Sequence, residues 1–301
     1  MTSTQLQAFS VVAKMKSFTS AALFLGVSQS AVSHAVKSLE DELGVSLFTR
    51  TRTDIILSEF GANILIKAHE ILGHFESIKQ EAQQTENLQK GSLKIGSFGP
   101  SFSAGVLPII LKEYQKRYPN IKVYVEEGED RLVKQWVMDR KIDLGSVILP
   151  EKELQHIYLT SDQVRIVLPR DHPLALRDSI SLPDLCEFPF ILTEGSTGKM
   201  LMELFKASKL KPNIAFNNIQ IMSMLSMVSH GAGISATAQL SISFLEQDTK
   251  SAYVLKPFKP TLQREIALAM QNINQLSPAA KAFVKTASKL ERAGRLNFAL
   301  D

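Results

Sequence analysis

The sequence of 301 residues predicts an α/β protein with a helical N-terminal region, and three patterns lead to this fold class. Residues 1–58 carry short helical repeats that are interrupted by a tight turn. A single long helical repeat then extends from Phe60 to about Gln84. From residue 91 onward, short β-type runs alternate with helical stripes, which is typical of helices packed on mainly parallel sheets.

The N-terminal region predicts a first helix over Gln5–Lys16, followed by two helices joined by a tight turn. Gly26-Val27-Ser28 forms the turn, because glycine readily takes a left-handed conformation and Ser28 can cap the next helix. The apolar faces consist of Leu6, Phe9 and Ala13 on the first helix, Ala21, Ala22 and Leu25 on the second, and Val32, Val36, Leu39 and Leu43 on the third. Steps of four, three and four residues on the third helix predict one buried stripe.

The opposite face of the third helix is small, polar and hydrogen-bonding. It carries Ser30, Ser33, His34 and Lys37, with Gln29 on its flank in the first turn. Such a face suits a helix in the DNA major groove, where short polar side chains contact base edges and lysine contacts phosphate. The alternative for this face alone is the solvated surface of an ordinary helical hairpin.

The string SFTSAALFLGVSQSAVSHAVKSLEDELGVSLFTR at residues 17–50 resembles the N-terminal winged helix-turn-helix of LysR-type transcriptional regulators. The resemblance continues through LSEFG at residues 57–61, where the family usually has Leu-Thr-x-Ala-Gly, and more loosely to the C-terminus. It implies a DNA-binding regulator controlled by a small-molecule effector.

The resemblance also implies a domain organisation. The parts would be a winged helix-turn-helix over residues 1–58, a linker helix and hinge over 59–90, and an effector-binding domain over 91–301. The last part would resemble type 2 periplasmic binding proteins, with subdomain I at about 91–161 and 261–301 and subdomain II at about 162–260.

The first implied partner is double-stranded promoter DNA. The residues expected to contact it are Thr19, Gln29, Ser30, Ser33, His34, Lys37, Arg50 and Arg52. The two arginines would lie at the entrance of the wing, a short hairpin that ends near residues 55–57. The family often has an arginine three residues after the position of Arg50, where this chain has Thr53, so the wing departs from the usual pattern.

The long helical segment has an apolar repeat with a period of 3.5 residues. The repeat consists of Ile64, Ala68, Ile71, Phe75, Ile78 and Ala82. Such a repeat, in a helix without another local partner, favours pairing with a second helix. The alternative is packing on the chain's own globular part. The resemblance implies a homodimer through this helix, often assembled further into a homotetramer.

Nine short runs predict strands in the rest of the chain. They are Leu93–Phe98, Ile121–Glu126, Leu144–Ile148, Val164–Leu168, Phe190–Leu192, Ile214–Phe216, Ile234–Ala236, Tyr253–Leu255 and Ile266–Met270. In an α/β fold of this kind, a ligand binds at the loops that leave the carboxyl ends of strands.

Three such loops form the expected effector site. They contain Ser97, Phe98, Gly99, Pro100, Ser101 and Phe102 after the first strand, Thr193, Glu194 and Ser196 after the fifth, and Asn218 and Ile219 after the sixth. Their hydroxyls, amides and backbone N–H groups suit a small polar effector. An anion is favoured only by the nearby Lys199, because no arginine or lysine lies inside the loops. The alternative is that these are ordinary loops and helix caps.

Composition bears on partners and localisation. The chain has a net charge of +4, but residues 1–58 carry five basic and four acidic side chains, so DNA binding must depend on where the cations lie. No apolar run reaches the roughly 18 residues of a membrane span, and the N-terminus lacks a signal-peptide pattern. Cys186 is the single cysteine, which excludes an internal disulfide. We therefore expect a cytoplasmic protein without a membrane partner.

No motif predicts an enzyme, a metal site or a cofactor. His69 and His74 resemble a zinc-protease pair, but they are five residues apart and would point about 140° away from each other on a helix. One alternative function is an enzyme or solute-binding protein with a coincidental helix-turn-helix. Another is a constitutive regulator without a ligand. A third is a regulator that responds to oxidation of Met222, Met224 and Met227, whereas a disulfide switch is excluded by the single cysteine.

Overall fold

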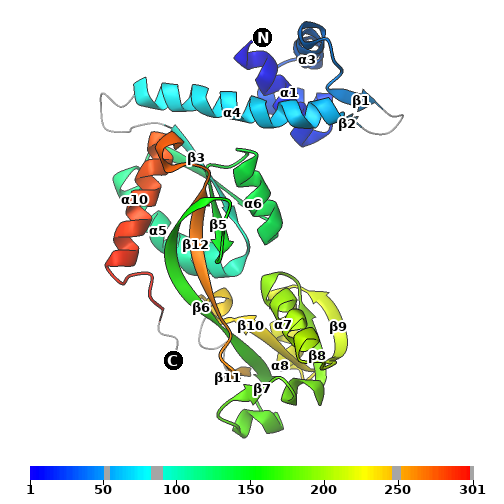
Figure 1. Cartoon of the computed structure of the whole chain (residues 1–301), viewed down its shortest axis with the longest axis vertical. Coiled ribbons are helices and arrows are strands. Elements are labelled where there is room, and N and C mark those ends of the chain that lie inside the picture. The colour runs from blue at the N-terminus through cyan, green and yellow to red at the C-terminus, as the bar shows by residue number, and fades with distance from the viewer. Residues whose placement is uncertain (51–54, 83–90, 246–251, 299–301) are drawn as a thin grey trace.

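The computed structural model describes residues 1–50, 55–82, 91–245 and 252–298, and Figure 1 shows their arrangement along the long axis of the molecule. A small N-terminal domain and the long helix α4 (Glu59–Ala82) lie at one end. Two α/β lobes follow, the first beneath α4 and the second at the far end.

The N-terminal domain consists of three helices and a two-stranded antiparallel wing. Its elements are α1 (Ser3–Met15), α2 (Phe18–Leu25), α3 (Gln29–Leu43), β1 (Phe48–Arg50) and β2 (Ile55–Leu57). The predicted turn is confirmed, because Gly26 has a φ of +68° and the Ser28 hydroxyl accepts the N–H of Ala31 at 3.2 Å. The predicted stripe of α3 is also confirmed, with Val32, Val36 and Leu39 buried and Leu43 half-buried.

The junction between the wing and α4 requires a glycine. The Ser58 hydroxyl caps α4 by accepting the N–H of Gly61 at 2.9 Å. A Cβ atom on Gly61 would lie 2.0 Å from the carbonyl oxygen of Leu47, so any side chain there would push α4 away from the domain. This close approach fixes how α4 leaves the N-terminal domain.

The first half of α4 packs on its own chain, which corrects the expectation that this helix has no local partner. Ala68 is 1% exposed, and Ile64 and Ile71 are half-buried against the same N-terminal core. Ala68 therefore cannot contribute to a surface that faces a second chain. Farther along, Phe75 and Ile78 remain 44% and 62% exposed.

One sheet runs through both lobes, and two of its strands pass from one lobe to the other. The elements of the first lobe are β3 (Gly91–Ser97), the π-helical turn Ser101–Val106, α5 (Leu107–Arg117), β4 (Ile121–Glu127), α6 (Asp130–Met138), β5 (Leu144–Ile148) and α10 (Pro278–Arg292). The second lobe contains β7 (Ile180–Ser181), β8 (Pro189–Thr193), α7 (Ser196–Ala207), β9 (Asn213–Ile219), α8 (Ile221–Ser229), β10 (Ile234–Ala238) and β11 (Tyr253–Lys259). The strands β6 (Gln155–Pro169) and β12 (Gln263–Met270) connect the lobes.

The strand order is β4-β3-β5-β12-β6-β10-β8-β9, with β11 also paired to β6. Pairing is parallel within β4-β3-β5 and within β10-β8-β9, but β6 and β12 pair antiparallel to their sheet neighbours. The sheet is therefore mixed instead of mainly parallel. β6 is also longer than the predicted Val164–Leu168, because residues 155–163 pair with β12.

Each lobe has its own apolar core. The core of the first lobe surrounds Phe102, Tyr114 and Phe283, and that of the second surrounds Phe190 and Phe205. Among the residues that the structure describes, none of the helices combines the length and apolar character needed to cross a membrane.

Candidate DNA-binding surface and ligand cleft

The outward face of α3 presents the polar side chains that the sequence predicted there. Gln29, Ser30, His34 and Lys37 are exposed, and Ser33 is half-buried. The amide nitrogen of Gln29 donates to the hydroxyl oxygen of Ser33 at 3.0 Å, so the two side chains are aligned along the helix. Thr19 is exposed in the first turn of α2.

The wing is attached to α3 through one carboxylate. Glu40 Oε1 accepts the backbone N–H groups of Leu47 at 2.7 Å and Phe48 at 3.3 Å. The ring of Phe48 meets those of Phe9 and Phe18 edge-to-face, which buries the base of the wing in the domain core. Arg50 is the last residue of β1, and Arg52 lies outside the described residues.

The two lobes meet around Arg264, a buried arginine of β12 that is 4% exposed, and we call this meeting region the cleft. Its Nη1 donates to Ser196 Oγ at 2.8 Å and to Thr197 Oγ1 at 3.3 Å, both at the start of α7. Its Nη2 donates to Ser101 Oγ, at the start of the π-helical turn that follows β3. The guanidinium group therefore joins a turn of the first lobe to a helix start of the second.

The charge of Arg264 is balanced by Asp162, its register partner on β6. Arg264 Nη2 lies 2.9 Å from Asp162 Oδ2, and both side chains are almost fully buried. Asp162 Oδ1 also accepts the backbone N–H of Leu240 at 3.0 Å, and the hydroxyls of Ser101 and Ser241 lie 2.6 Å apart. We call Arg264, Asp162, Ser101, Ser196 and Thr197 the Arg264 cluster.

The predicted residues of the first loop have different roles. Ser97 Oγ accepts the N–H of Gly99 at 3.2 Å, which closes a tight turn with a φ of +139° at the glycine. The ring centroid of Phe98 lies 5.5 Å from the Arg264 guanidinium carbon. Pro100 directly precedes the π-helical turn. Phe102 was expected at the ligand, but it is fully buried in the core of the first lobe, so that expectation is wrong.

The residues of the other two predicted loops differ in burial and in their contacts. Thr193 is buried at the end of β8. Glu194 is exposed, and its N–H donates to the carbonyl of Ile219 at 3.1 Å. Asn218 is exposed on β9 with a φ of +55°. Within the described residues, the side-chain hydrogen bonds of Arg264 go to the Arg264 cluster and not to Asn218 or Ile219.

The sequence analysis missed Arg264 and Asp162. The predicted strand begins at Ile266, which places Arg264 in a connection. The sequence carries one signal, because the two-residue spacing of Arg264 and Ile266 puts them on the same face of an extended strand, and the structure buries that face and exposes Gln263 and Glu265.

Charged residues also meet at the rim of the cleft. Lys199 Nζ lies 2.6 Å from Glu129 Oε2, and this hydrogen bond lowers the pKa of Glu129. The neighbouring Asp130 is half-buried in the first turn of α6, and burial raises its pKa against the opposing influence of Arg264 and Lys199. The rim therefore pairs an acid of the first lobe with a cation of the second.

The candidate oxidation sites differ in reactivity and exposure. Burial, followed by the nearby Glu187, raises the pKa of the Cys186 thiol, which disfavours the reactive thiolate. Met224 is fully buried in the core of the second lobe, whereas Met222 is exposed.

These features define a protein with a winged helix-turn-helix DNA-binding domain joined to a two-lobed domain of the ligand-binding type. Two family descriptions match the chain. "Bacterial regulatory helix-turn-helix protein, lysR family" matches residues 3–62, and "LysR substrate binding domain" matches residues 86–290. The chain belongs to the LysR family of DNA-binding transcription regulators.

Relatives in sequence support the same assignment. The HTH-type transcriptional regulator YvbU of Bacillus subtilis (strain 168) is 33% identical over 291 residues, which cover 96% of this chain and 99% of the relative. The regulator YybE of the same organism is 30% identical over 283 residues, which cover 93% of this chain and 95% of the relative.

Solved structures share the fold over the whole chain. A full-length OxyR variant from Pseudomonas aeruginosa is similar with a TM-score of 0.77 and 22% identity, covering 100% of this chain and 99% of that one. CbnR in complex with its target DNA is similar with a TM-score of 0.65 and 20% identity, covering 96% and 99% of the two chains.

Proposed function

We propose that this regulator responds to a small polar anion, most simply a carboxylate, that binds between the two lobes at the Arg264 cluster. The single observation that carries this proposal is the buried Arg264, whose guanidinium contacts hydroxyls from both lobes. A planar guanidinium matches the two oxygens of a carboxylate. The backbone N–H groups at the start of α7 add a partial positive charge beside it.

A ligand at this site would change the arrangement of the lobes. Ser101 belongs to the first lobe, and Ser196 and Thr197 belong to the second, so the Arg264 cluster holds the lobes together without a ligand. A bound carboxylate would replace hydroxyls as the acceptor of the guanidinium N–H groups. Because its affinity would depend on lobe separation, binding would favour one arrangement over another. The subdomain limits proposed here are residues 91–161 with 261–301, and 162–260.

The DNA-binding part of the proposal concerns individual contacts. Gln29, Ser30 and Ser33 would contact base edges in the major groove, while Lys37 with the wing arginines Arg50 and Arg52 would contact phosphates. The exposed polar face of α3 supports the first assignment. The protein would act in the cytoplasm as a homodimer through the exposed end of α4, with a homotetramer as the larger assembly.

The ligand proposal can be tested by thermal shift on the full-length protein against a panel of small carboxylates at constant ionic strength. At least one carboxylate should raise the melting temperature in a saturable way. Arg264→Lys keeps the charge but loses the planar fork, so it should weaken that carboxylate by about 10-fold or more. Arg292→Lys, on the exposed last turn of α10, is the matched control and should bind like the wild type.

The outcomes separate the alternatives. Saturable binding that Arg264→Lys leaves unchanged would place the ligand outside the Arg264 cluster. No response to any carboxylate would favour the constitutive regulator. Loss of DNA binding after mild oxidation, and its retention in Met222→Leu, would favour a methionine switch instead.

A further inference from the structure

Helix α6 reaches from the ligand cleft to the linker helix α4 (Figure 1). Its N-terminal cap, Glu129, forms the ion pair with Lys199 of the second lobe. Its C-terminal end continues into Asp139 and Arg140, which contact α4. Nine helical residues span about 13 Å, so the two contact regions are separated by one short, stiff element.

The first contact with α4 is made by His69. Its Nδ1 lies 3.2 Å from the carbonyl oxygen of Asp139, and its Nε2 lies 2.9 Å from Ser10 Oγ on α1. Because a carbonyl oxygen only accepts, Nδ1 carries a proton, and in the neutral ring Nε2 then accepts from the Ser10 hydroxyl. A neutral His69 therefore joins the first lobe, the linker helix and the DNA-binding domain through two hydrogen bonds.

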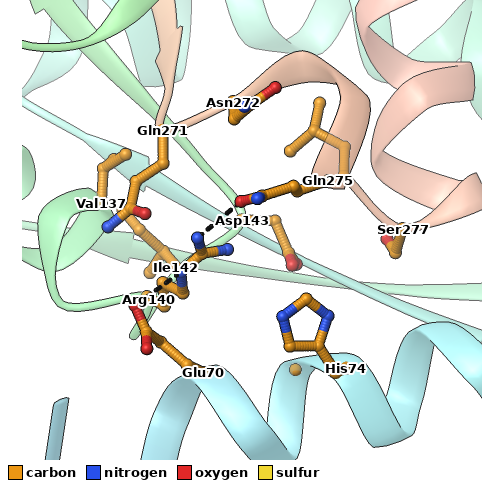
Figure 2. A pocket seen from close by; sticks show the side chains of 12 residues that line it. Glu70, His74, Val137, Arg140, Ile142, Asp143, Gln271, Asn272, Gln275 and Ser277 are labelled. Carbon is orange, nitrogen blue, oxygen red and sulfur yellow. Dashed lines mark hydrogen bonds and ion pairs between the residues drawn. The ribbon is translucent and has the colours of Figure 1, made fainter. Parts of the chain in front are cut away.

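The second contact is made by the neighbouring residue Glu70. Figure 2 shows Arg140 between Glu70 and Gln275, with Nε 3.2 Å from Glu70 Oε1 and Nη2 2.7 Å from Gln275 Oε1. Arg140 has a φ of +51°, so this contact depends on a backbone turn that few side chains favour. A cavity of about 60 Å³ beside the pair, which includes His74 in its lining, leaves room for the side chains to rearrange.

At Gly96 and Gly145 the body of α6 lies against sheet backbone instead of side chains. A Cβ atom on Gly96 would lie 2.4 Å from Ile142 Cδ1, and one on Gly145 would lie 2.7 Å from Val137 Cγ2. Val133 and Val137 of α6 therefore rest directly on glycine backbone. Val147, Ala267 and Ala269 of the same sheet pack around them in one buried cluster. Because this contact is close-packed, α6 should move as one body, so that a displacement at its N-terminal end also reaches its C-terminal end.

We propose that α6 couples the cleft to the linker helix, so that a change at the Glu129–Lys199 end alters how firmly Asp139 and Arg140 hold His69 and Glu70. The role of the cleft as a ligand site is taken from the proposed function, but the coupling itself requires no ligand. Since His69 also bonds to Ser10, the position of the DNA-binding domain relative to the first lobe follows α6. Coupling of this kind is reciprocal, so loosening α4 should also loosen the cleft rim.

Hydrogen exchange on the full-length protein tests the coupling without an effector. Lys199→Glu places two carboxylates opposite each other at the rim, and amides of α4 at residues 66–74 should exchange about two- to fivefold faster. Lys206→Glu, the same change in the last turn of α7, is the matched control and should leave residues 66–74 unchanged. Combining Glu129→Lys with Lys199→Glu restores opposite charges and should return exchange of residues 66–74 to the wild-type rate.

The reverse experiment starts at the other end. Arg140→Glu should speed exchange of residues 196–201 by a similar factor, and adding Glu70→Arg should reverse it. Unchanged α4 exchange in Lys199→Glu, or equal acceleration in Lys206→Glu, would overturn the coupling even if carboxylates bind. If the exchange rates show the coupling but no carboxylate raises the melting temperature, α6 still connects the cleft to α4 and the proposed ligand is refuted.

Discussion

Replacing Ile78 by glutamate should weaken dimerisation through α4, because this side chain is 62% exposed in the single chain. Fully burying an isoleucine contributes roughly 1.5–3 kcal/mol, so covering the exposed part corresponds to about 1–2 kcal/mol per chain. A two-fold symmetric dimer contains two copies. The expected loss is therefore about 2–4 kcal/mol, or roughly 30- to 1000-fold in the dimer dissociation constant.

Sedimentation velocity over a dilution series measures this constant directly. Leu176→Glu is the matched control, because Leu176 is 92% exposed on the second lobe and its replacement should leave the dimer intact. Ile71 is unsuitable for the same test, since it packs on the N-terminal core and a charge there would also destabilise the domain. If the Ile78→Glu dimer dissociates over the same concentration range as the wild type, this end of α4 does not form the dimer interface.

Two further predictions concern DNA contacts and pH. Ser33→Ala should weaken binding to a selected specific DNA by about 1–3 kcal/mol and spare random DNA, whereas Lys37→Ala should weaken binding to both and reduce the slope of log affinity against log salt concentration by about 1. Gel-shift titrations at several salt concentrations measure both effects. Equal losses for Ser33→Ala on both DNAs would contradict base readout by Ser33. Burial lowers the pKa of His69, against the opposing bond to the Asp139 carbonyl. The unfolded state therefore takes up the proton first, so the free energy of unfolding should fall as the pH drops below about 6.5 and be insensitive to this group above that value. In urea titrations the wild type should lose more stability than His69→Gln between about pH 7.5 and pH 5.5, and parallel losses would refute the assignment.

The N-terminal domain was predictable because its signals are local. The turn at Gly26 and the cap at Ser28 depend on residues within a few positions of each other. The apolar repeat of α4 was equally visible, but its partner was not. A period of 3.5 residues is the same whether the covering surface belongs to another chain or to the N-terminal core, so Ala68 was assigned to the wrong surface.

The centre of the cleft was less predictable because its contacts are distant in sequence. Arg264 and Asp162 are 102 residues apart, and Ser101 is 163 residues from Arg264. Residues 155–163 of β6 contain polar side chains and lack a clear apolar alternation. They form a strand because β12 supplies its hydrogen-bonding partner, which no local pattern can reveal. The loops after β3 and β8 were nevertheless found, since their position after strands is a local property.

The placement of Arg264 and Asp162 supports the proposal that control is exerted at the cleft and not in the core of either lobe. A buried ion pair seldom stabilises a protein more than a well-packed apolar pair of the same size, so stability alone gives little reason for charges here. These two residues are register partners on the strands that connect the lobes. Any relative movement of the lobes that separates Ser101 from Ser196 leaves guanidinium N–H groups without acceptors, which is costly in a buried site. A ligand that supplies the missing acceptor therefore selects a lobe arrangement, and an apolar pair at the same position could not make that selection.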